Sequence, residues 1–364
     1  MILPFKIPFP LVKPVLHALD PEVAHTVTIK SLKAGLAPQS DKVQDESLHT
    51  EFCNLKFDNP VGLAAGFDKN AEVIAPMFGF GFGFIEVGGV TTVPQKGLPK
   101  PRIFRDPINQ AIINKMNFPN VGVEEFKNNV ERFKEKNSGD HYPLGIQIAK
   151  SADQKDPDKD FKKLLGEVGD LASYVTVNIS CPNTEGLRDL EQKNHFTALL
   201  SGLMEERDKL GLNNLPIITK FSPDLSPAKL DDLAEACLDI KIDGVILANT
   251  TTSRPSHLPE EFSQRQGGLS GKPLTDMSTE IIRSFYKKTN GQVPIIGVGG
   301  ISSGLDAYNK IKAGATLVQL YSALVFKGPE VINEIKTDLI HLLKEDGYSN
   351  IREAVGTNAQ HESQ

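Results

Sequence analysis

Eight short apolar segments, each followed by a polar loop and usually by an amphipathic helical stretch, recur along the chain from about residue 55. This alternation of strand and helix signals is typical of a parallel sheet covered by helices. Eight such units predict a (β/α)8 barrel, the TIM-barrel architecture, which needs about 250 residues. A doubly wound open sheet is the alternative. The expected strands are Val61–Ala64, Phe84–Val87, Leu144–Ile148, Tyr174–Ile179, Ile217–Lys220, Gly244–Ala248, Ile295–Val298 and Leu317–Leu320.

The composition suits a globular protein that can bury a large core. Of the 364 residues, 39% are hydrophobic and 24% are charged, which argues against a disordered chain. The net charge of −6 argues against a general nucleic-acid binder, because such proteins normally carry a basic face. The three cysteines, Cys53, Cys181 and Cys237, are too few and too far apart for a disulfide framework, so a reducing compartment is favoured.

Residues 1–40 differ from the rest of the chain and are expected to form a separate element in front of a barrel domain, residues 41–364. The apolar residues around Phe5 and Phe9 are interrupted by prolines, so they cannot form the ~20-residue helix that crosses a bilayer. Two short helices are expected, and Asp20-Pro21-Glu22 is a good start for the second. Their apolar surface indicates either a lid packed on the barrel or an interfacial element that touches lipid or a lipidic substrate.

The segment Val177–Thr184 places a thiol between two carboxamides. Pro182 follows Cys181 directly and ends the strand, so this polar group lies at the strand's carboxyl end. Parallel α/β folds keep their reactive groups at that end. The loops after the other strands supply lysines, amides and hydroxyls but no cluster of carboxylates or histidines, so no metal site is expected.

Glycine-rich loops follow the last strands of the predicted barrel. Gly297–Gly304 and Tyr321-Ser322 fall where barrels commonly hold a phosphate on backbone N–H groups, and Gly267–Gly271 adds a third such loop. Each loop alone is equally compatible with a tight turn. Lys220 ends its strand and either extends to solvent or places an ammonium in the barrel mouth, where it would stabilise the negative charge of a reduced flavin. Together these features favour a phosphate-bearing cofactor.

Several motifs, in order along nearly the whole chain, resemble the dihydroorotate dehydrogenase family. The N-terminal helical pair, with Asp20-Pro21-Glu22 and His25, is similar to the membrane-associated, quinone-using class 2 branch, because class 1 enzymes lack that extension. The motifs that carry the resemblance are Asn59–Asn70, Asn178–Thr184, Ala248–Thr251 with Ser253–Pro255, Gly267–Leu274, Ile295–Gly304 and Val318–Tyr321.

The resemblance implies an FMN-dependent oxidation of (S)-dihydroorotate to orotate in pyrimidine biosynthesis, with ubiquinone or menaquinone as acceptor. Cys181 matches the position of the catalytic base, and His25 and Arg105 match polar residues near the inner end of a quinone tunnel. Substrate contacts are implied for Lys69, Asn114, Phe118, Asn178, Asn183, Asn249 and Thr250. Flavin contacts are implied for Ala65, Gly66, Lys69, Gly89, Gln147, Asn178, Lys220, Ala248, Ser270, Gly271, Gly299, Gly300, Tyr321 and Ser322.

The chain departs from the class 2 pattern at its base position, which is usually Ser in class 2 and Cys in class 1. A free thiol has a pKa near ~8.5, so Cys181 is expected to support activity at lower pH than a Ser at this position. Other departures are Asn117 and Pro119 in the substrate lid, and Gly89, Gln147 and Ala248 in the flavin site.

Three alternatives differ in class. One is a class 1-type enzyme with a soluble acceptor, fumarate or NAD; the second is another FMN barrel reductase of pyrimidine rings; the third is a barrel that only binds a ligand. No NAD(P)H or iron–sulfur module is recognisable to support the second. No targeting peptide precedes Met1, so peripheral attachment at the cytoplasmic face of a bacterial inner membrane is expected.

Overall fold

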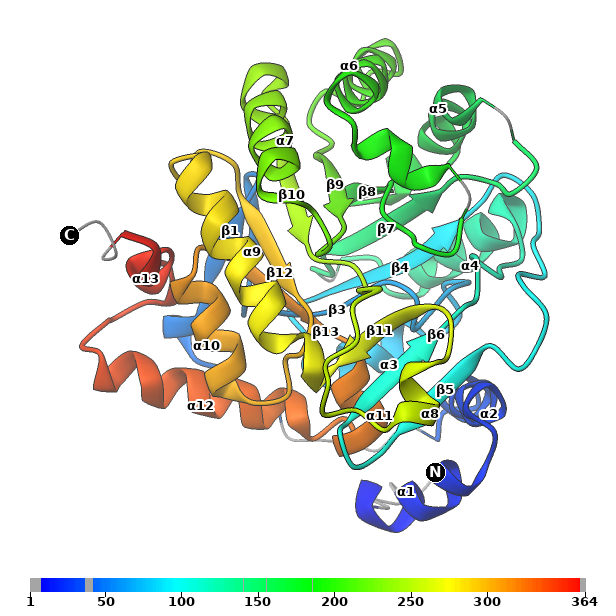
Figure 1. Cartoon of the computed structure of the whole chain (residues 1–364), viewed down its shortest axis with the longest axis vertical. Coiled ribbons are helices and arrows are strands. Elements are labelled where there is room, and N and C mark those ends of the chain that lie inside the picture. Colours follow the sequence, from blue (N-terminus) through cyan, green and yellow to red (C-terminus); the bar gives the residue numbers. More distant parts are fainter. Residues whose placement is uncertain (1–7, 37–41, 140, 155, 185, 361–364) are drawn as a thin grey trace.

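Eight parallel strands close into a barrel in the computed structural model, which describes residues 8–36, 42–139, 141–154, 156–184 and 186–360. Each strand pairs with the next in sequence, and the last pairs with the first. The predicted (β/α)8 fold is confirmed, and an open sheet is excluded (Figure 1). The barrel strands are β3 (Val61–Leu63), β4 (Phe84–Val90), β7 (Leu144–Ala149), β8 (Tyr174–Asn178), β9 (Ile217–Phe221), β10 (Gly244–Leu247), β12 (Ile295–Val298) and β13 (Leu317–Leu320).

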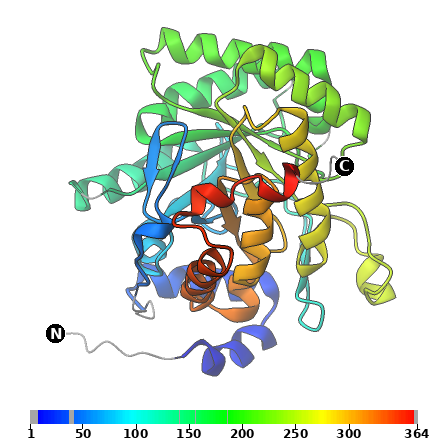
Figure 2. The same cartoon turned by 90° about the vertical axis from the view of Figure 1, so that its left-hand side faces the viewer.

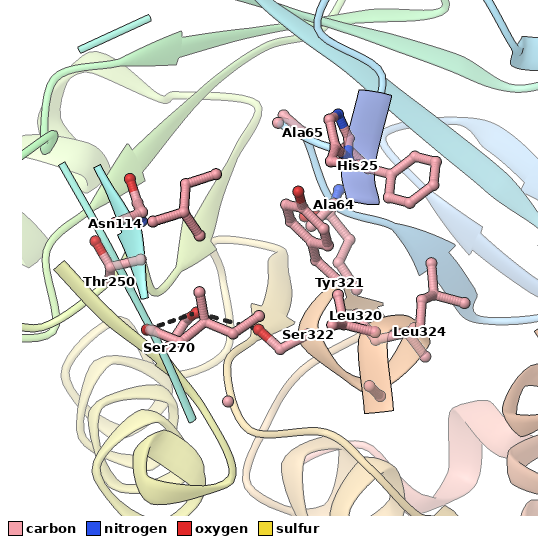
Figure 3. Close-up of a pocket in the computed structure, with 18 of the residues that line it drawn as sticks. His25, Ala64, Ala65, Asn114, Thr250, Ser270, Leu320, Tyr321, Ser322 and Leu324 are labelled. Carbon is pink, nitrogen blue, oxygen red and sulfur yellow. Dashed lines mark hydrogen bonds between the residues drawn. The ribbon is translucent and has the colours of Figure 1, made fainter. Parts of the chain in front are cut away.

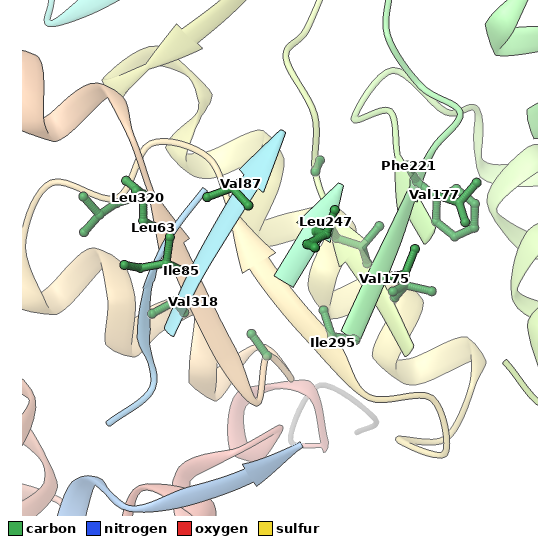
Figure 4. Packing of buried hydrophobic residues seen from close by; sticks show 14 of the residues in the cluster. Leu63, Ile85, Val87, Val175, Val177, Phe221, Leu247, Ile295, Val318 and Leu320 are labelled. Atoms are coloured by element: carbon green, nitrogen blue, oxygen red, sulfur yellow. The ribbon is translucent and has the colours of Figure 1, made fainter. Parts of the chain in front are cut away.

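Amphipathic helices follow the strands and surround the barrel. Outward-facing strand residues such as Ile85, Val87 and Val175 form the apolar layer on which these helices pack (Figure 4). The larger helices are α3 (Ile74–Gly79), α4 (Val123–Lys136), α5 (Pro157–Val168), α6 (Lys193–Lys209), α7 (Pro227–Ile240), α9 (Thr275–Lys288), α10 (Gly304–Lys312), α11 (Ser322–Lys327) and α12 (Val331–Glu345). Shorter elements are α8 (Glu260–Ser263), α13 (Thr357–Gln360), η1 (Glu46–Leu48), η2 (Gly169–Leu171), η3 (Leu187–Glu191), η4 (Lys272–Leu274) and η5 (Ile351–Ala354).

The amino-terminal end of the barrel is closed by an antiparallel hairpin of β1 (Thr50–Phe52) and β2 (Leu55–Phe57). Phe52 and Phe57 are buried in one apolar cluster with inward-facing barrel residues that include Phe84 and Tyr174, and the Phe57 and Phe84 rings meet edge to face. Aromatic rings therefore fill this end of the barrel, which leaves the carboxyl end of the strands for a ligand.

The N-terminal residues form two helices, α1 (Phe9–Ala18) and α2 (Pro21–Lys33), that lie together at one end of the molecule (Figures 1 and 2). The side chain of Asp20 caps α2 by accepting from the backbone N–H groups of Glu22 and Val23, as the sequence predicts. Residues 1–7 and 37–40 of the predicted element lie outside the described residues. Within the part of the chain described, no helix combines the length and apolarity needed to cross a bilayer.

Side chains of the barrel domain hold the helical pair in place. The guanidinium of Arg102 donates to both carboxylate oxygens of Glu22, at 3.0 and 2.7 Å. Arg105 donates to the carbonyls of Leu16, His17 and Leu19, where α1 ends. A cation at a helix C-terminus also offsets the negative end of the helix dipole.

A small sheet beside the helical pair has no counterpart in the sequence prediction. It consists of β5 (Ile103–Asp106), β6 (Ala111–Asn114) and β11 (Gly268–Gly271), all antiparallel. β11 is the segment predicted only as a loop of close approach. The sheet matters for the site because it brings Asn114 and Ser270 to the open end of the barrel.

Candidate active site

One cavity of about 860 Å³ opens at the carboxyl end of the barrel strands and continues between the helical pair and the barrel. In Figure 3, Asn114 and Thr250 lie on one side, His25 lies on the other, and Tyr321 lies between them. Every residue predicted for the site lines this cavity: His25, Ala65, Gly66, Lys69, Gly89, Arg105, Asn114, Phe118, Gln147, Asn178, Cys181, Asn183, Lys220, Ala248, Asn249, Thr250, Ser270, Gly271, Gly299, Gly300, Tyr321 and Ser322. The structure thus brings them together, while their individual roles stay predictions.

Glycines allow the backbone to form a close-fitting cradle in the cavity wall. Gly271 and Gly300 have φ of +94° and +74°, and a Cβ at either position would lie within 2.2 Å of a neighbouring oxygen atom. The hydroxyls of Ser270 and Ser322 meet at 3.1 Å beside this cradle (Figure 3). Backbone N–H groups and hydroxyls without bulky side chains suit an anion such as a phosphate.

Lys220 is the buried cation of the site. Its side chain is only 6% exposed, and its ammonium makes no hydrogen bond with any residue that the structure describes. Burial lowers the pKa of Lys220, and the negative charge of Glu86 opposes that shift. A buried ammonium without a partner is costly unless a ligand supplies an acceptor or a negative charge. The cradle and Lys220 therefore fit a flavin with a phosphate-bearing side chain.

A chain of carboxamides runs from the barrel interior to the cavity. Glu86, which is fully buried, accepts from the Gln147 amide at 2.9 Å, and Gln147 accepts from the Asn178 amide at 2.9 Å. The Asn249 amide lies 3.5 Å from the Asn178 oxygen and 3.0 Å from the Ser180 hydroxyl. Since a carboxylate without a proton only accepts hydrogen bonds, Glu86 fixes the orientation of Gln147 and hence that of Asn178. One N–H of each of these two amides is left for a bound molecule.

Cys181 lies among these carboxamides and is 8% exposed. Burial raises the pKa of the thiol, while the backbone N–H of Asn183 and the side chain of Thr184 oppose the shift. The thiolate therefore forms at higher pH than it would in a free cysteine. The pH advantage over Ser that the sequence suggests stays a prediction.

The predicted substrate lid has an unusual backbone. Asn117 and Phe118 have φ of +58° and +49°, a region that non-glycine residues rarely adopt. Amides of Gln95 and Asn120 hold the Phe118 carbonyl at 3.2 and 2.8 Å. A Cβ at Gly89 would lie 3.1 Å from the Phe118 ring, so the glycine at this position lets the ring pack close to the cavity wall.

His25, Lys69 and Phe67 mark the transition from the barrel mouth to the space under the helices. The Lys69 ammonium donates to the Gly66 carbonyl at 2.6 Å and lies 3.5 Å from Nε2 of His25. Burial, and then the charge of Lys69, lower the pKa of His25 well below its usual value, so this imidazole is neutral. Burial also lowers the pKa of Lys69 to about 8. Arg105 lines the same region but is occupied by the carbonyls of α1.

The sequence reasoning missed the apolar walls of this second region and the polar group beneath the site. Glu86 was read only as part of a buried strand; a carboxylate in an otherwise apolar strand is a signal that could have been used. The walls come mainly from the helical pair and from α3 and α11: Phe9, Val12, Leu16, Ala24, Val27, Leu32, Leu36, Met77, Phe80, Leu324 and Phe326. Among the described residues, no group of three or more His, Cys, Asp and Glu side chains is arranged to hold a metal ion.

A (β/α)8 barrel with a glycine cradle and a buried lysine at its mouth fits the class of oxidoreductases that hold a flavin. The family model for dihydroorotate dehydrogenase matches residues 47–343. The dihydroorotate dehydrogenase (quinone) of Azorhizobium caulinodans is 43% identical over 96% of this chain and 99% of its own length. The mitochondrial dihydroorotate dehydrogenase (quinone) of Mus musculus is 43% identical over 93% of this chain and 87% of its own length. The chain belongs to the dihydroorotate dehydrogenase family.

Solved structures agree with this assignment. The crystal structure of the Eimeria tenella enzyme in complex with ferulenol covers 95% of this chain and 99% of its own, with a TM-score of 0.90 and 36% identity. The ligand-free form from the same organism superimposes with a TM-score of 0.89 and 38% identity. Both comparisons cover more than nine-tenths of this chain.

Proposed function

We propose that this protein oxidises (S)-dihydroorotate to orotate and passes the electrons to a quinone, as a step of pyrimidine biosynthesis. The observation that carries the proposal is the single cavity that joins a thiol among carboxamides at one end to an apolar space under two helices at the other. The names of the relatives, dihydroorotate dehydrogenase (quinone), support a quinone and disfavour the soluble acceptor of a class 1-type enzyme.

Cys181 is proposed as the general base that takes the proton from C5 of dihydroorotate. A positioned base of this kind contributes about 10²- to 10⁴-fold to a rate. Phe118 and its loop would cover the substrate and exclude water. The groups proposed to bind the carboxylate and ring amides of the substrate are Lys69, Asn114, Asn178, Asn183, Asn249 and Thr250.

FMN is the proposed cofactor. When bound, it supplies hydride-accepting chemistry that protein side chains lack. Lys220 would place its positive charge beside the ring, and the glycine cradle, through its Gly299–Gly300 loop, would hold the phosphate. The remaining proposed contacts are Ala65, Gly66, Lys69, Gly89, Gln147, Asn178, Ala248, Ser270, Gly271, Tyr321 and Ser322.

We further propose that residues 1–40 are a quinone and membrane element and that residues 41–364 are the catalytic barrel. Leu11, Val15 and Leu36 leave 70%, 64% and 70% of their surface exposed on this element, which supports peripheral contact with lipid. His25 and Arg105 would lie near the inner end of the quinone tunnel. Attachment at the cytoplasmic face of a bacterial inner membrane, with ubiquinone or menaquinone as acceptor and without a metal, completes the proposal.

The decisive experiment is steady-state dihydroorotate oxidation by the purified, detergent-solubilised protein with one acceptor at a time. Saturable reduction of a short-chain ubiquinone, with little activity on fumarate or NAD⁺, is the expected result. Fumarate reduction without quinone reduction would overturn the acceptor assignment and make Cys181 the mark of a class 1-type enzyme.

A further inference from the structure

Lys310, on α10, is a fully buried lysine outside the lining of the cavity. Its ammonium donates to the Thr275 carbonyl at 3.1 Å, to the Ser278 hydroxyl at 2.6 Å and to the Thr279 hydroxyl at 2.8 Å. These three acceptors satisfy the three N–H bonds of an ammonium group. Burial lowers the pKa of Lys310 to about 7, against the opposing charges of Asp306 and Asp276. A buried amine with no carboxylate bonded to it is costly, so its partners call for an explanation.

The partners of Lys310 lie directly behind the glycine cradle. The Ser278 hydroxyl lies 2.9 Å from the Gly299 carbonyl, and the Thr275 hydroxyl lies 2.9 Å from the Gly300 carbonyl. A Cβ at Gly300 would lie 2.2 Å from the Thr275 hydroxyl, so the loop rests on the start of α9 without a gap. Lys310 is thus one hydrogen bond removed from the loop that lines the cavity.

Lys310 also determines where the single hydrogen of the Ser278 hydroxyl goes. That hydroxyl has two acceptors in reach, the Thr275 carbonyl at 3.0 Å and the Gly299 carbonyl at 2.9 Å. The Thr275 carbonyl already accepts from Lys310 and from the Thr279 hydroxyl. Because Lys310 occupies a lone pair of Ser278 as well, the Ser278 hydrogen is directed to Gly299.

The Gly299 carbonyl, held by Ser278, and the Gly300 carbonyl, which the Thr275 hydroxyl contacts, set the direction of two N–H groups. The Thr275 hydroxyl also has the Lys272 carbonyl in reach at 2.8 Å, and Lys310 anchors the Thr275 main chain and not this hydroxyl. In a planar trans peptide the N–H points opposite to the C=O, so holding the Gly299 and Gly300 carbonyls toward α9 turns the N–H groups of Gly300 and Ile301 away from it. Both residues line the cavity, and neither N–H has an acceptor among the described residues. Two unpaired N–H groups on adjacent residues form a site for a phosphate oxygen.

We propose that Lys310 is a positioning residue for the cofactor phosphate: by directing the Ser278 hydroxyl to Gly299 and by anchoring the main chain of Thr275, on which Gly300 rests, it holds the Gly299–Gly300 loop so that two backbone N–H groups face the cavity. The inference rests on the proposed FMN site and adds to it a residue that contacts neither the cavity nor the cofactor. It predicts that Lys310 matters for the phosphate of the ligand and not for its ring.

The test compares FMN with riboflavin, which carries the same ring without the phosphate. Affinities of both for the full-length apoprotein are measured by quenching of flavin fluorescence. Lys310→Met is expected to weaken FMN binding by about 10- to 100-fold, the usual range for lost hydrogen bonds to a charged group, and to change riboflavin binding less than about twofold. Lys336→Met is the matched control.

Lys336 suits this purpose because it is also buried but bonds to residues that do not line the cavity. Its side chain is 1% exposed, burial lowers its pKa to about 8, and its ammonium donates to the carbonyls of Val43 and Gly81. Lys336→Met should therefore share any general cost of losing a buried lysine while leaving the ratio of FMN to riboflavin affinity unchanged.

A second variant keeps the proposal falsifiable if Lys310→Met does not fold. Ser278→Ala removes one hydroxyl and is expected to lower FMN affinity selectively; where both variants fold, the double variant should lose less than the sum of the two effects, because both act on one carbonyl. If Lys310→Met folds and still prefers FMN over riboflavin as the wild type does, the role of Lys310 is overturned, while the proposed cofactor stands. If only Ser278→Ala folds, the same result in that variant overturns the role of Lys310. A wild-type protein that binds FMN no better than riboflavin would instead overturn the proposed cofactor.

Discussion

We predict that the ion pair between Glu22 and Arg102 supports the part of the cavity under the two helices, where the quinone is proposed to bind, and does not affect the barrel. Glu22 lies at the start of α2, which carries Ala24, His25 and Leu32 into the cavity wall. Its carboxylate is 13% exposed and Arg102 is 7% exposed, so solvent screens this pair poorly. The pKa of Glu22 is lowered chiefly by its hydrogen bonds with Arg102, which means that the folded state favours the charged carboxylate.

Glu22→Gln keeps the shape of the side chain and removes the charge. Hydrogen bonds to charged groups contribute about 1.5–3 kcal/mol, so the docking of α2 should weaken by about 2 kcal/mol, or about 30-fold. Arg102 retains its bonds to the carbonyls of Lys96 and Leu98 and stays in place. The proposed quinone tunnel requires α2 to be docked, so kcat/KM for quinone should fall by up to about 30-fold.

Two measurements separate the half-reactions. Stopped-flow reduction of the flavin by dihydroorotate should be nearly unchanged, while steady-state quinone reduction should fall. Lys33→Met is the control on the same helix: Lys33 pairs with Glu72 at 2.8 Å but is 58% exposed, and such pairs contribute less than about 1 kcal/mol. If Glu22→Gln slowed both half-reactions equally, the ion pair would serve the whole fold and the reasoning would be refuted.

Four further predictions concern the other parts of the site. Cys181→Ala should slow flavin reduction by about 10²- to 10⁴-fold. With the thiol in place, the rate should climb as pH rises through the raised pKa of Cys181, and in Cys181→Ser the climb should move to still higher pH; identical stopped-flow pH profiles would contradict this. Gly300→Ala should purify without bound flavin, since its Cβ would lie 2.2 Å from the Thr275 hydroxyl; a variant with a full FMN absorbance spectrum would count against the cradle. Removing residues 1–40 should abolish quinone reduction while FMN stays bound, and a truncated protein with full quinone activity would disprove the tunnel.

The barrel was predictable because its signals are local. Each barrel strand is a short apolar segment bounded by polar or glycine-rich residues, and the barrel follows from their number. The ends of the strands were harder to predict. β4 continues through Gly88 and Gly89 to Val90, where its pairing with β7 is irregular. The sheet of β5, β6 and β11 was missed because β11 pairs with a strand more than a hundred residues earlier, and no local pattern indicates such a partner.

The sequence predicted which residues line the site but not the hydrogen bonds between them or their burial. Positions such as Asn178 and Lys220 follow from their place at strand ends, and their assigned roles came from the family resemblance. Hydrogen-bond direction could not be read from the sequence, because it depends on Glu86, which is near the site only in three dimensions. The burial of Cys181 could not be predicted from the sequence either, although it changes the expected pH dependence.

The two ends of the cavity are made by parts of the chain that are held in place in different ways. Carboxamides and glycines at the barrel mouth are tied to the strands, so a change there disturbs neighbours on several sides. The helical pair, in contrast, is held to the barrel by polar contacts of Arg102 with Glu22 and of Arg105 with the end of α1, and the residues of its apolar wall make mainly apolar contacts. A substitution among these wall residues should therefore change the shape of the space under the helices while the barrel mouth keeps its hydrogen bonds.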